Sequence, residues 1–282
     1  MNSKGYSFRL LSLEVIGFVL AILFLFPFYF LVVNSVKSFR DIVANTANLP
    51  KEFIWSNYSQ AWEIMQYPKA FTNSLLITVL SIIGIILFSS MAAYRMVRNP
   101  SKLNKVLFVL FVTAMVIPFQ AVMIPLVKLG GMITIGGEAM IGTMWGLIIC
   151  YFGFGVPLSI FLYHGFMKSV PLEIEEAAVV DGCSTYGVFW KIVFPLLKPM
   201  TVTIILLNSL WIWNDFLLPL LWINSPDLRT IPLSTYSFFG QYMKKWDLAL
   251  PALIMGAAPI IIFFLALQKH IIEGITAGSV KG

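Results

Sequence analysis

Long runs of apolar residues, separated by shorter polar segments, dominate this 282-residue sequence. An α-helix needs about 20 predominantly apolar residues to cross the hydrocarbon core of a bilayer. Six runs reach that length, at about residues 12–34, 71–93, 105–127, 143–163, 200–222 and 251–270. The pattern predicts an all-α membrane protein with six transmembrane helices, which together form a single transmembrane domain over residues 1–282.

The polar segment 164–199, between the fourth and fifth runs, contains a predicted helix. Pro171 suits a first helical turn, where its missing N–H is no loss. The positive end of the helix dipole favours carboxylates, and three follow within two turns: Glu173, Glu175 and Glu176. Helical spacing also places three small or apolar residues on one face, open to close approach by a partner: Ile174, Ala177 and Ala178.

The same segment carries signals for a helix end and a second helix. Asp181-Gly182 predicts the end, because glycine readily takes the left-handed conformation of a C-terminal cap. Ser184 is placed to cap a second helix, which Pro195 or Pro199 delimits. A loop that only joins two membrane helices needs no such detail. The segment is therefore predicted to be a docking surface.

The composition agrees with a membrane location, and the distribution of Lys and Arg indicates which loops face the cytoplasm. Charged residues make up 11% of the sequence, whereas soluble domains carry about 25%. The net charge of +6 is explained by basic residues that flank membrane helices, so nucleic acid is not an expected partner. The linker 94–105 holds four basic residues and no acid, which marks it as cytoplasmic. With that assignment both termini are cytoplasmic, and 11 of the 19 Lys and Arg residues lie inside.

The N-terminus and the two cysteines need no special explanation. Lys4 and Arg9 precede an apolar run that resembles a secretion signal, but the run is too long and no small-residue cleavage site follows. We interpret it as a retained first membrane helix. Cys150 and Cys183 are predicted at different membrane depths, so a disulfide between them is not expected.

Polar residues inside the fifth apolar run are candidates for a transport pathway. They are Asn208, Trp211, Asn214 and Asp215. The run still inserts, because its apolar residues outweigh the cost of one central aspartate, about 3 kcal/mol. Asn208, Trp211 and Asp215 share one face. Such residues form a pathway or gate, or alternatively hydrogen bonds between helices or a position at the outer interface.

The third run contains Pro118 and Pro125. Proline frees backbone carbonyls within the membrane, and these must be satisfied by neighbours or by a wet cavity. A kink at these prolines is therefore predicted, either beside a translocation path or as a packing feature.

Sequence motifs for catalysis are missing. The sequence has no phosphate-binding Gly-x-x-x-x-Gly-Lys-Ser/Thr loop, no Cys/His cluster at metal-ligand spacing and no nucleophile motif. Asp215 alone is too little for a proton-coupled carrier, which usually needs several ionisable groups along its path. The chain is therefore predicted not to be an enzyme, and energy for transport must come from another polypeptide.

The docking segment resembles the signature loop of permease subunits of binding-protein-dependent ABC importers. That loop reads Glu-Ala-Ala, three residues, Gly, nine residues, Ile-x-Leu-Pro. The sequence matches it at six positions: Glu176, Ala177, Ala178, Gly182, Ile192 and Pro195. It departs at Phe194, where leucine is usual, although the apolar character is kept. Several other segments resemble the maltose-type branch, in which this chain corresponds to the shorter partner permease.

The resemblance implies partners, cofactors and site residues. A separate ABC ATPase dimer, which binds ATP and Mg, would dock on a coupling helix, while this chain itself holds no cofactor or metal. The implied coupling residues are Glu173, Glu176, Ala177, Ala178, Asp181, Gly182, Ile192 and Pro195. A second permease subunit, expected to be a paralogue, would enclose the path. An extracytoplasmic sugar-binding protein would contact the external segment 224–250, with Tyr236, Tyr242 and Trp246 as candidates.

The implied function is ATP-driven import of carbohydrates, oligosaccharides in particular, across the bacterial cytoplasmic membrane. The resemblance also places both termini in the cytoplasm. Glycerol-phosphate is the alternative substrate, although a phosphate requires clustered Arg or Lys near the path, and no such cluster lies within the predicted spans. A proton-coupled carrier is a further alternative, and it would depend on Asp215 instead of the loop.

Overall fold

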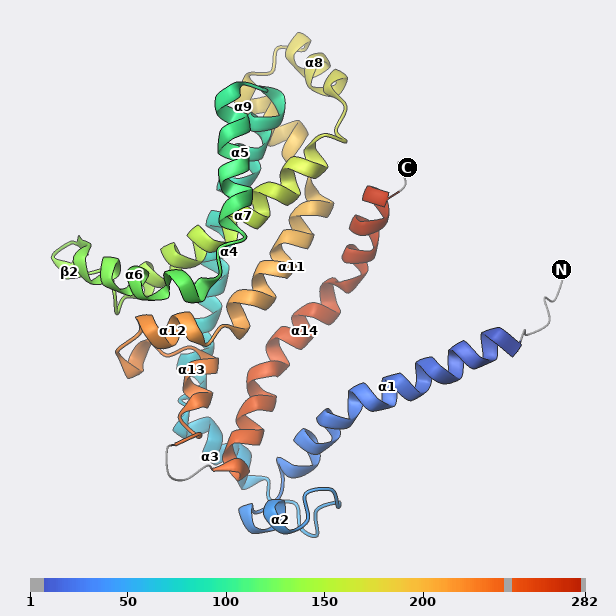
Figure 1. Cartoon of the computed structure of the whole chain (residues 1–282), viewed down its shortest axis with the longest axis vertical. Coiled ribbons are helices and arrows are strands. Elements are labelled where there is room, and N and C mark those ends of the chain that lie inside the picture. Colours follow the sequence, from blue (N-terminus) through green and yellow to red (C-terminus); the bar gives the residue numbers. More distant parts are fainter. Residues whose placement is uncertain (1–7, 241–244, 280–282) are drawn as a thin grey trace. The chain divides into compact units, whose positions relative to one another are not determined.

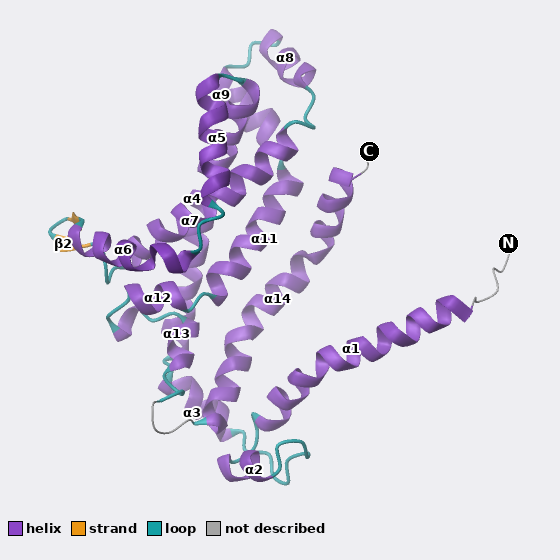
Figure 2. Cartoon of the chain, viewed as in Figure 1, coloured by secondary structure: helices purple, strands orange, loops and turns teal. Residues whose placement is uncertain are grey.

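Helices form almost all the regular structure of the chain (Figures 1 and 2). The computed structural model describes residues 8–240 and 245–279. The longer helices are α1 (Phe8–Asn34), α3 (Ser56–Ile64), α4 (Tyr67–Arg98), α5 (Lys102–Ala114), α6 (Phe119–Met132), α7 (Met144–Met167), α8 (Leu172–Val180), α11 (Lys198–Asn214) and α14 (Trp246–Ser279). The shorter elements are α2 (Phe39–Ala44), β1 (Thr134–Ile135), β2 (Glu138–Ala139), α9 (Thr185–Gly187), η1 (Val188–Val193), α10 (Phe194–Leu196), α12 (Leu217–Trp222), η2 (Pro226–Leu228) and α13 (Ile231–Tyr236).

The described chain divides into two units. One comprises residues 8–66 and 235–257, and the other residues 67–234 and 258–279. In the first unit, the apolar helix α1 has an exposed surface over nearly its whole length, with Phe24 75% exposed. A helix of this kind requires lipid or another protein around it.

The loop that follows α1 is organised by a buried lysine. Lys37 is fully buried, and its Nζ donates hydrogen bonds to the carbonyl oxygens of Asn45 (2.9 Å) and Asn48 (2.5 Å). Asn57 Nδ2 donates to the carbonyl oxygens of Ser35 (3.2 Å) and Lys37 (2.8 Å), which ties α3 to the same loop. A buried charge is tolerated only when its polar partners are supplied, and here the backbone supplies them.

The second unit is built on α4, which lies beside α7 and α11 (Figure 1). Four small residues of α4 are fully buried and allow this close approach: Ser81, Ser89, Ser90 and Ala93. Small residues have that function between membrane helices, where lipid offers no hydrophobic drive for association. Tyr163 of α7 adds a polar link, since its hydroxyl is 2.9 Å from Thr201 Oγ1 of α11.

Four of the predicted membrane helices are present as continuous helices. They are α1, α4, α7 and α14, each long and apolar enough to cross a membrane. Within the described chain, two pairs of helices joined at a sharp bend are also long and apolar enough to cross a membrane. They are Lys102–Ala114 with Phe119–Met132, and Thr185–Leu196 with Lys198–Asn214. The total is six if each pair counts as one span.

The predicted span 105–127 is broken at the first of its two prolines, where a kink was predicted. The chain bends by 102° between α5 and α6. Pro118 lies at the start of α6 with φ −68° and ψ 140°, an extended conformation. Because proline lacks an N–H and disfavours helical geometry in the residue before it, the helix cannot continue through this point. Pro125 lies inside α6.

The predicted helix over 200–222 is also interrupted. The chain bends by 72° where α11 begins, and α11 ends at Asn214. Asp215 is extended (φ −71°, ψ 129°), and its Oδ1 accepts a hydrogen bond of 3.1 Å from the Leu217 N–H at the start of α12. An aspartate that binds backbone two residues on competes with the helix, as in turns and helix starts.

Candidate functional site

The segment between α7 and α11 folds into a helical hairpin, hereafter the α8 hairpin, residues 171–197. Its first helix ends as predicted, because Gly182 has a φ of +86°. The Gly182 N–H donates to the carbonyl of Val179 and the Cys183 N–H to that of Ala178, both at 3.0 Å. These are the two hydrogen bonds of a Schellman cap. A Cβ at Gly182 would meet no atom within 4 Å, so the backbone conformation alone favours glycine here.

The second helix of the hairpin also begins as predicted. Ser184 Oγ accepts a hydrogen bond of 3.2 Å from the Gly187 N–H. The helix then passes through the π-helical segment η1 and ends at Leu196, between the two prolines expected to delimit it. Ile192 is half-buried and Pro195 is exposed.

The outer surface of α8 is exposed and partly apolar. Val180 is 87% exposed, and further exposed positions are Leu172, Glu173, Ile174, Glu176, Ala177 and Val179. Asp181 and Gly182 at its end are exposed as well. The predicted face of Ile174, Ala177 and Ala178 needs correction, because Ala178 is buried with Glu175 against the rest of the unit. Sequence spacing alone did not identify which side of the helix faces inward.

Glu175 fixes the hairpin to the end of α4. Its Oε1 accepts from Arg98 Nε at 2.7 Å, and its Oε2 accepts from the Tyr94 hydroxyl at 2.9 Å. Arg98 Nη2 also donates to the carbonyl oxygen of Val170 at 2.9 Å. The Arg98 and Glu175 side chains are only 17% and 7% exposed. From the sequence, Glu175 was expected only to interact with the helix dipole, and its ion pair with Arg98 was not predicted. The i, i+3 spacing of Glu175 and Ala178 places both on one side of α8, and this was the one sequence feature that could have indicated a buried position for Glu175.

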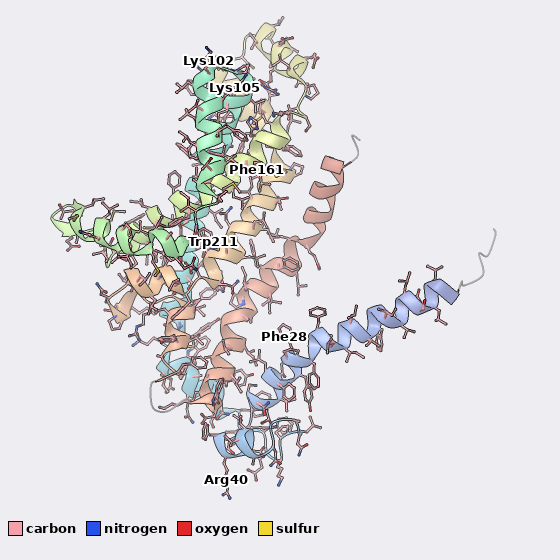
Figure 3. The ribbon with its side chains drawn as sticks, in the orientation of Figure 1. Phe28, Arg40, Lys102, Lys105, Phe161 and Trp211 are labelled. Carbon is pink, nitrogen blue, oxygen red and sulfur yellow. The ribbon has the colours of Figure 1, made fainter. Side chains whose placement is uncertain are left out.

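The basic linker lies at the same end of the unit as the hairpin. Figure 3 labels Lys102 and Lys105 on the first turns of α5. Both side chains are exposed. The linker predicted to be cytoplasmic and the predicted docking segment therefore share one end of the second unit.

Three of the four predicted pathway residues face α7. Asn208 is buried and its Nδ2 donates to Ser159 Oγ at 3.3 Å. Trp211 is half exposed, and its ring meets the ring of Tyr151 edge-on, with centroids 5.5 Å apart. The Tyr151 hydroxyl donates to Asp215 Oδ2 at 2.9 Å. Asn208, Trp211 and Asp215 therefore lie on one side, toward α7, as their spacing predicts.

Asn214, the fourth candidate, is exposed, and its Nδ2 donates to the Leu210 carbonyl of its own helix at 2.7 Å. Ser159 and Tyr151 were missed at the sequence level. Each lies in an apolar run without a motif, so no local signal marks it.

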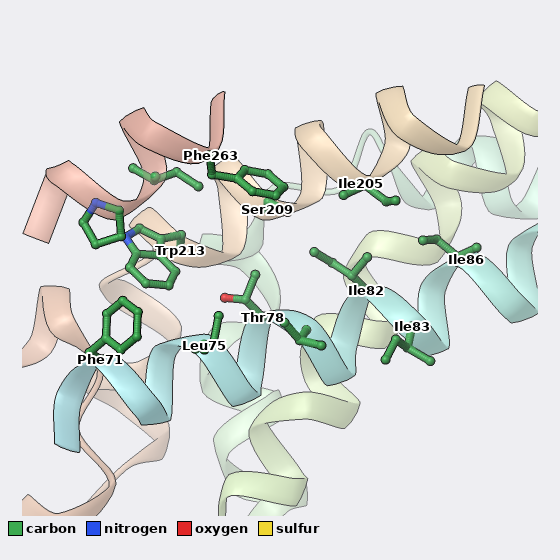
Figure 4. A pocket seen from close by; sticks show the side chains of 13 residues that line it. Phe71, Leu75, Thr78, Ile82, Ile83, Ile86, Ile205, Ser209, Trp213 and Phe263 are labelled. Atoms are coloured by element: carbon green, nitrogen blue, oxygen red, sulfur yellow. The ribbon is translucent and has the colours of Figure 1, made fainter. Parts of the chain in front are cut away.

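An apolar cavity of about 410 Å³ lies between α4, α11 and the part of α14 in the second unit (Figure 4). Phe71, Trp213 and Phe263 line it, and the hydroxyls of Thr78 and Ser209 are its few polar groups. Carbohydrates need hydrogen-bond partners for many hydroxyls. The lining of this cavity therefore suits hydrocarbon better than a sugar.

The external candidates are only partly described. Tyr236 is 51% exposed, and the Trp246 ring meets that of Phe239 edge-on at 5.4 Å between centroids. Tyr242 lies outside the described residues. In the described part of the chain, no group of three His, Cys, Asp or Glu side chains could hold a metal ion, and both cysteines are free thiols.

The chain is similar to a known family and to several of its members. The family described as binding-protein-dependent transport system inner membrane component matches residues 85–276. A probable starch degradation products transport system permease of Thermoanaerobacterium thermosulfurigenes is 42% identical over 95% of this chain and 96% of its own. A melibiose, raffinose and stachyose import permease of Bacillus subtilis is 35% identical over 99% of both.

A solved structure has the same fold. It is the crystal structure of a bacterial ABC transporter involved in the import of the acidic polysaccharide alginate. One of its chains matches with a TM-score of 0.80 and 18% identity, over 95% of this chain and 98% of that one.

Proposed function

The chain belongs to the family of inner membrane components of binding-protein-dependent transport systems, and on this premise we propose that it is a permease subunit for ATP-driven import of oligosaccharides. It is a multi-pass protein of the bacterial plasma membrane, and a transport component. The relatives support the carbohydrate assignment, since they are named for starch degradation products and for melibiose, raffinose and stachyose.

The α8 hairpin is the proposed docking site for a separate ATPase dimer, which would bind ATP and Mg. The observation that carries this proposal is the exposed apolar surface of α8, which includes Val179 (58% exposed) and Val180 (87%), outside the long membrane helices. Exposed apolar surface with a polar rim is typical of protein interfaces. The exposed acids Glu173, Glu176 and Asp181 form that rim. With the hairpin on the cytoplasmic side, both termini are cytoplasmic as well.

A second permease subunit and an extracytoplasmic binding protein complete the proposed assembly. The exposed apolar surface of α1 supports a neighbouring chain within the bilayer. Trp211, Asn214 and Asp215 are the proposed pathway residues, because an exposed aromatic face and amide or carboxylate groups suit a sugar. Tyr236 and Trp246 remain the proposed contacts with the binding protein.

Co-purification tests the docking proposal. The complete transporter is expressed with an affinity tag on this chain, and the retained ATPase is quantified. Val180→Asp places a charge in the proposed interface, and we expect it to remove most of the ATPase and the uptake of labelled maltotriose or raffinose into proteoliposomes.

Val43→Asp is the matched control. It alters another strongly exposed valine (67%, against 87% for Val180) in the short helix α2, and ATPase retention should equal that of the wild type. Full retention with Val180→Asp would contradict the docking proposal. Uptake by the permease without any ATPase would favour a carrier instead.

A further inference from the structure

The C-terminal end of α4 holds both arms of the α8 hairpin. Tyr94 and Arg98 are four residues apart, so they project from the same face of α4. Both bind Glu175 of α8. The Tyr94 ring also packs on the ring of Phe189 in η1, with centroids 5.1 Å apart. Arg98 in addition holds the carbonyl of Val170, just before α8.

The contact of Arg98 with Glu175, hereafter the joint, is also favoured by the dipoles of the two helices. Arg98 is the last residue of α4, where the helix dipole is negative, and Glu175 lies near the start of α8, where it is positive. Both side chains are largely buried. Separating such a pair leaves a buried charge uncompensated, which is strongly unfavourable. Any displacement of α8 therefore favours an equal displacement of the end of α4.

The other end of α4 is held just as firmly. Asn73 Nδ2 donates to the carbonyl oxygens of Asp227 (2.9 Å) and Arg229 (3.1 Å). Ser74 Oγ accepts from the Ile231 N–H at 2.9 Å. These bonds join α4 to the segment that follows α12, at the end of the unit far from the hairpin (Figure 1).

α4 itself is suited to transmit displacement over that distance. It has 32 residues, which corresponds to roughly 48 Å at 1.5 Å per residue. Its sequence has no proline after Pro68, whereas α7 contains Pro157 and α6 contains Pro125. Proline is the usual cause of sharp bends in helices, so α4 lacks the weak point that those helices have.

We propose that α4 is a rigid connecting rod, joined to the α8 hairpin by Arg98, Glu175 and Tyr94 and to the segment 227–231 by Asn73 and Ser74. Displacement of α8 by the ATPase is carried by α4 to the opposite side of the membrane. Arg98 and Glu175 are positioning residues in this scheme. The inference rests on the proposed function, because it takes α8 as the place where force enters.

The test compares ATPase retention, ATP hydrolysis and uptake in one reconstituted transporter. Arg98→Met breaks the joint, Glu175→Gln keeps its shape without the charge, and Tyr94→Phe removes one hydrogen bond. Asn73→Ala loosens the far end. We expect all four to retain the ATPase and to hydrolyse ATP. Uptake of labelled maltotriose or raffinose per ATP should fall by roughly 3- to 30-fold for Arg98→Met, the range by which single substitutions change coupling between sites, and by less for Tyr94→Phe.

Controls separate this proposal from the docking proposal. Lys102→Met removes an exposed basic residue at the same end of the unit and should leave uptake per ATP unchanged. The exchange Arg98→Glu with Glu175→Arg should restore part of what either single change loses. If Arg98→Met fails to fold, Tyr94→Phe and Asn73→Ala decide the question.

Unchanged uptake per ATP in the folded variants would overturn the connecting rod. So would loss of the ATPase from Arg98→Met and Glu175→Gln, because the pair would then only shape the docking surface. Failure of the unaltered chain to retain the ATPase would instead refute the proposed function.

Discussion

The hydroxyl of Tyr151 donates a 2.9 Å hydrogen bond to the carboxylate of Asp215 and so links α7 to the break between α11 and α12. Tyr151 is 1% exposed, and the same ring packs against Trp211. The aspartate that looks unsupported in the sequence therefore has a specific partner. The other carboxylate oxygen of Asp215 accepts a hydrogen bond from the N–H of Leu217, the first residue of α12.

Removing that hydrogen bond should destabilise the protein. Tyr151→Phe leaves the Asp215 carboxylate without its side-chain donor, and we expect a loss of about 1–3 kcal/mol. Thermal unfolding in detergent measures it. Asn214→Ala, at the exposed last position of α11, should change the unfolding temperature little. Equal effects of the two substitutions would contradict the structural importance of the Tyr151–Asp215 bond.

Gly182 should respond to backbone preference and not to side-chain size. With a φ of +86° and open space at the Cβ position, Gly182→Val should cost about 1–2 kcal/mol of strain. Gly182→Asn should cost less, because asparagine tolerates the left-handed region. ATPase retention and uptake are the readouts. If Gly182→Asn reduces ATPase retention and uptake as much as Gly182→Val does, a steric contact with a partner would be indicated instead.

Lys37 should be essential for the loop between α1 and α3. Lys37→Met leaves the carbonyls of Asn45 and Asn48 without their donor in a buried site, and each lost partner costs about 1–3 kcal/mol. Limited proteolysis should cut the variant faster between residues 38 and 55. Lys51→Met, at an exposed position of the same loop, is the control and should be cut at the wild-type rate.

Two adjacent glycines of α6 should behave in opposite ways. A Cβ at Gly130 would approach the Trp222 ring to within 2.5 Å, whereas one at Gly131 would meet nothing within 4 Å. Gly130→Ala should destabilise by about 1–3 kcal/mol through overpacking. Gly131→Ala should stabilise by about 0.5–1 kcal/mol, since alanine favours the helix. Thermal unfolding of both variants is the measurement. If both substitutions lower the unfolding temperature equally, α6 does not tolerate substitution in general and the prediction is wrong.

Features that depend on neighbouring residues could be predicted from the sequence, whereas contacts between distant residues could not. The end of α8 at Gly182 and the cap at Ser184 were predicted, because both depend on the conformation of a few neighbouring residues. The bend at Pro118 and the end of α11 at Asp215 were predicted only in part. A proline or a buried aspartate indicates that a helix is weakened, but the 102° turn depends on what packs around it.

The sequence by itself determined that the chain is a helical membrane protein with a structured polar hairpin before the fifth apolar run. Insertion into a bilayer depends on the summed hydrophobicity of about 20 consecutive residues, and helix caps on a few neighbouring ones, so both are local. Only the tertiary structure decided that Glu175 pairs with Arg98, 77 positions earlier, and Asp215 with Tyr151, 64 positions earlier. Partners that far apart are chosen by which helix faces meet in three dimensions, and no periodicity within a single helix contains that information.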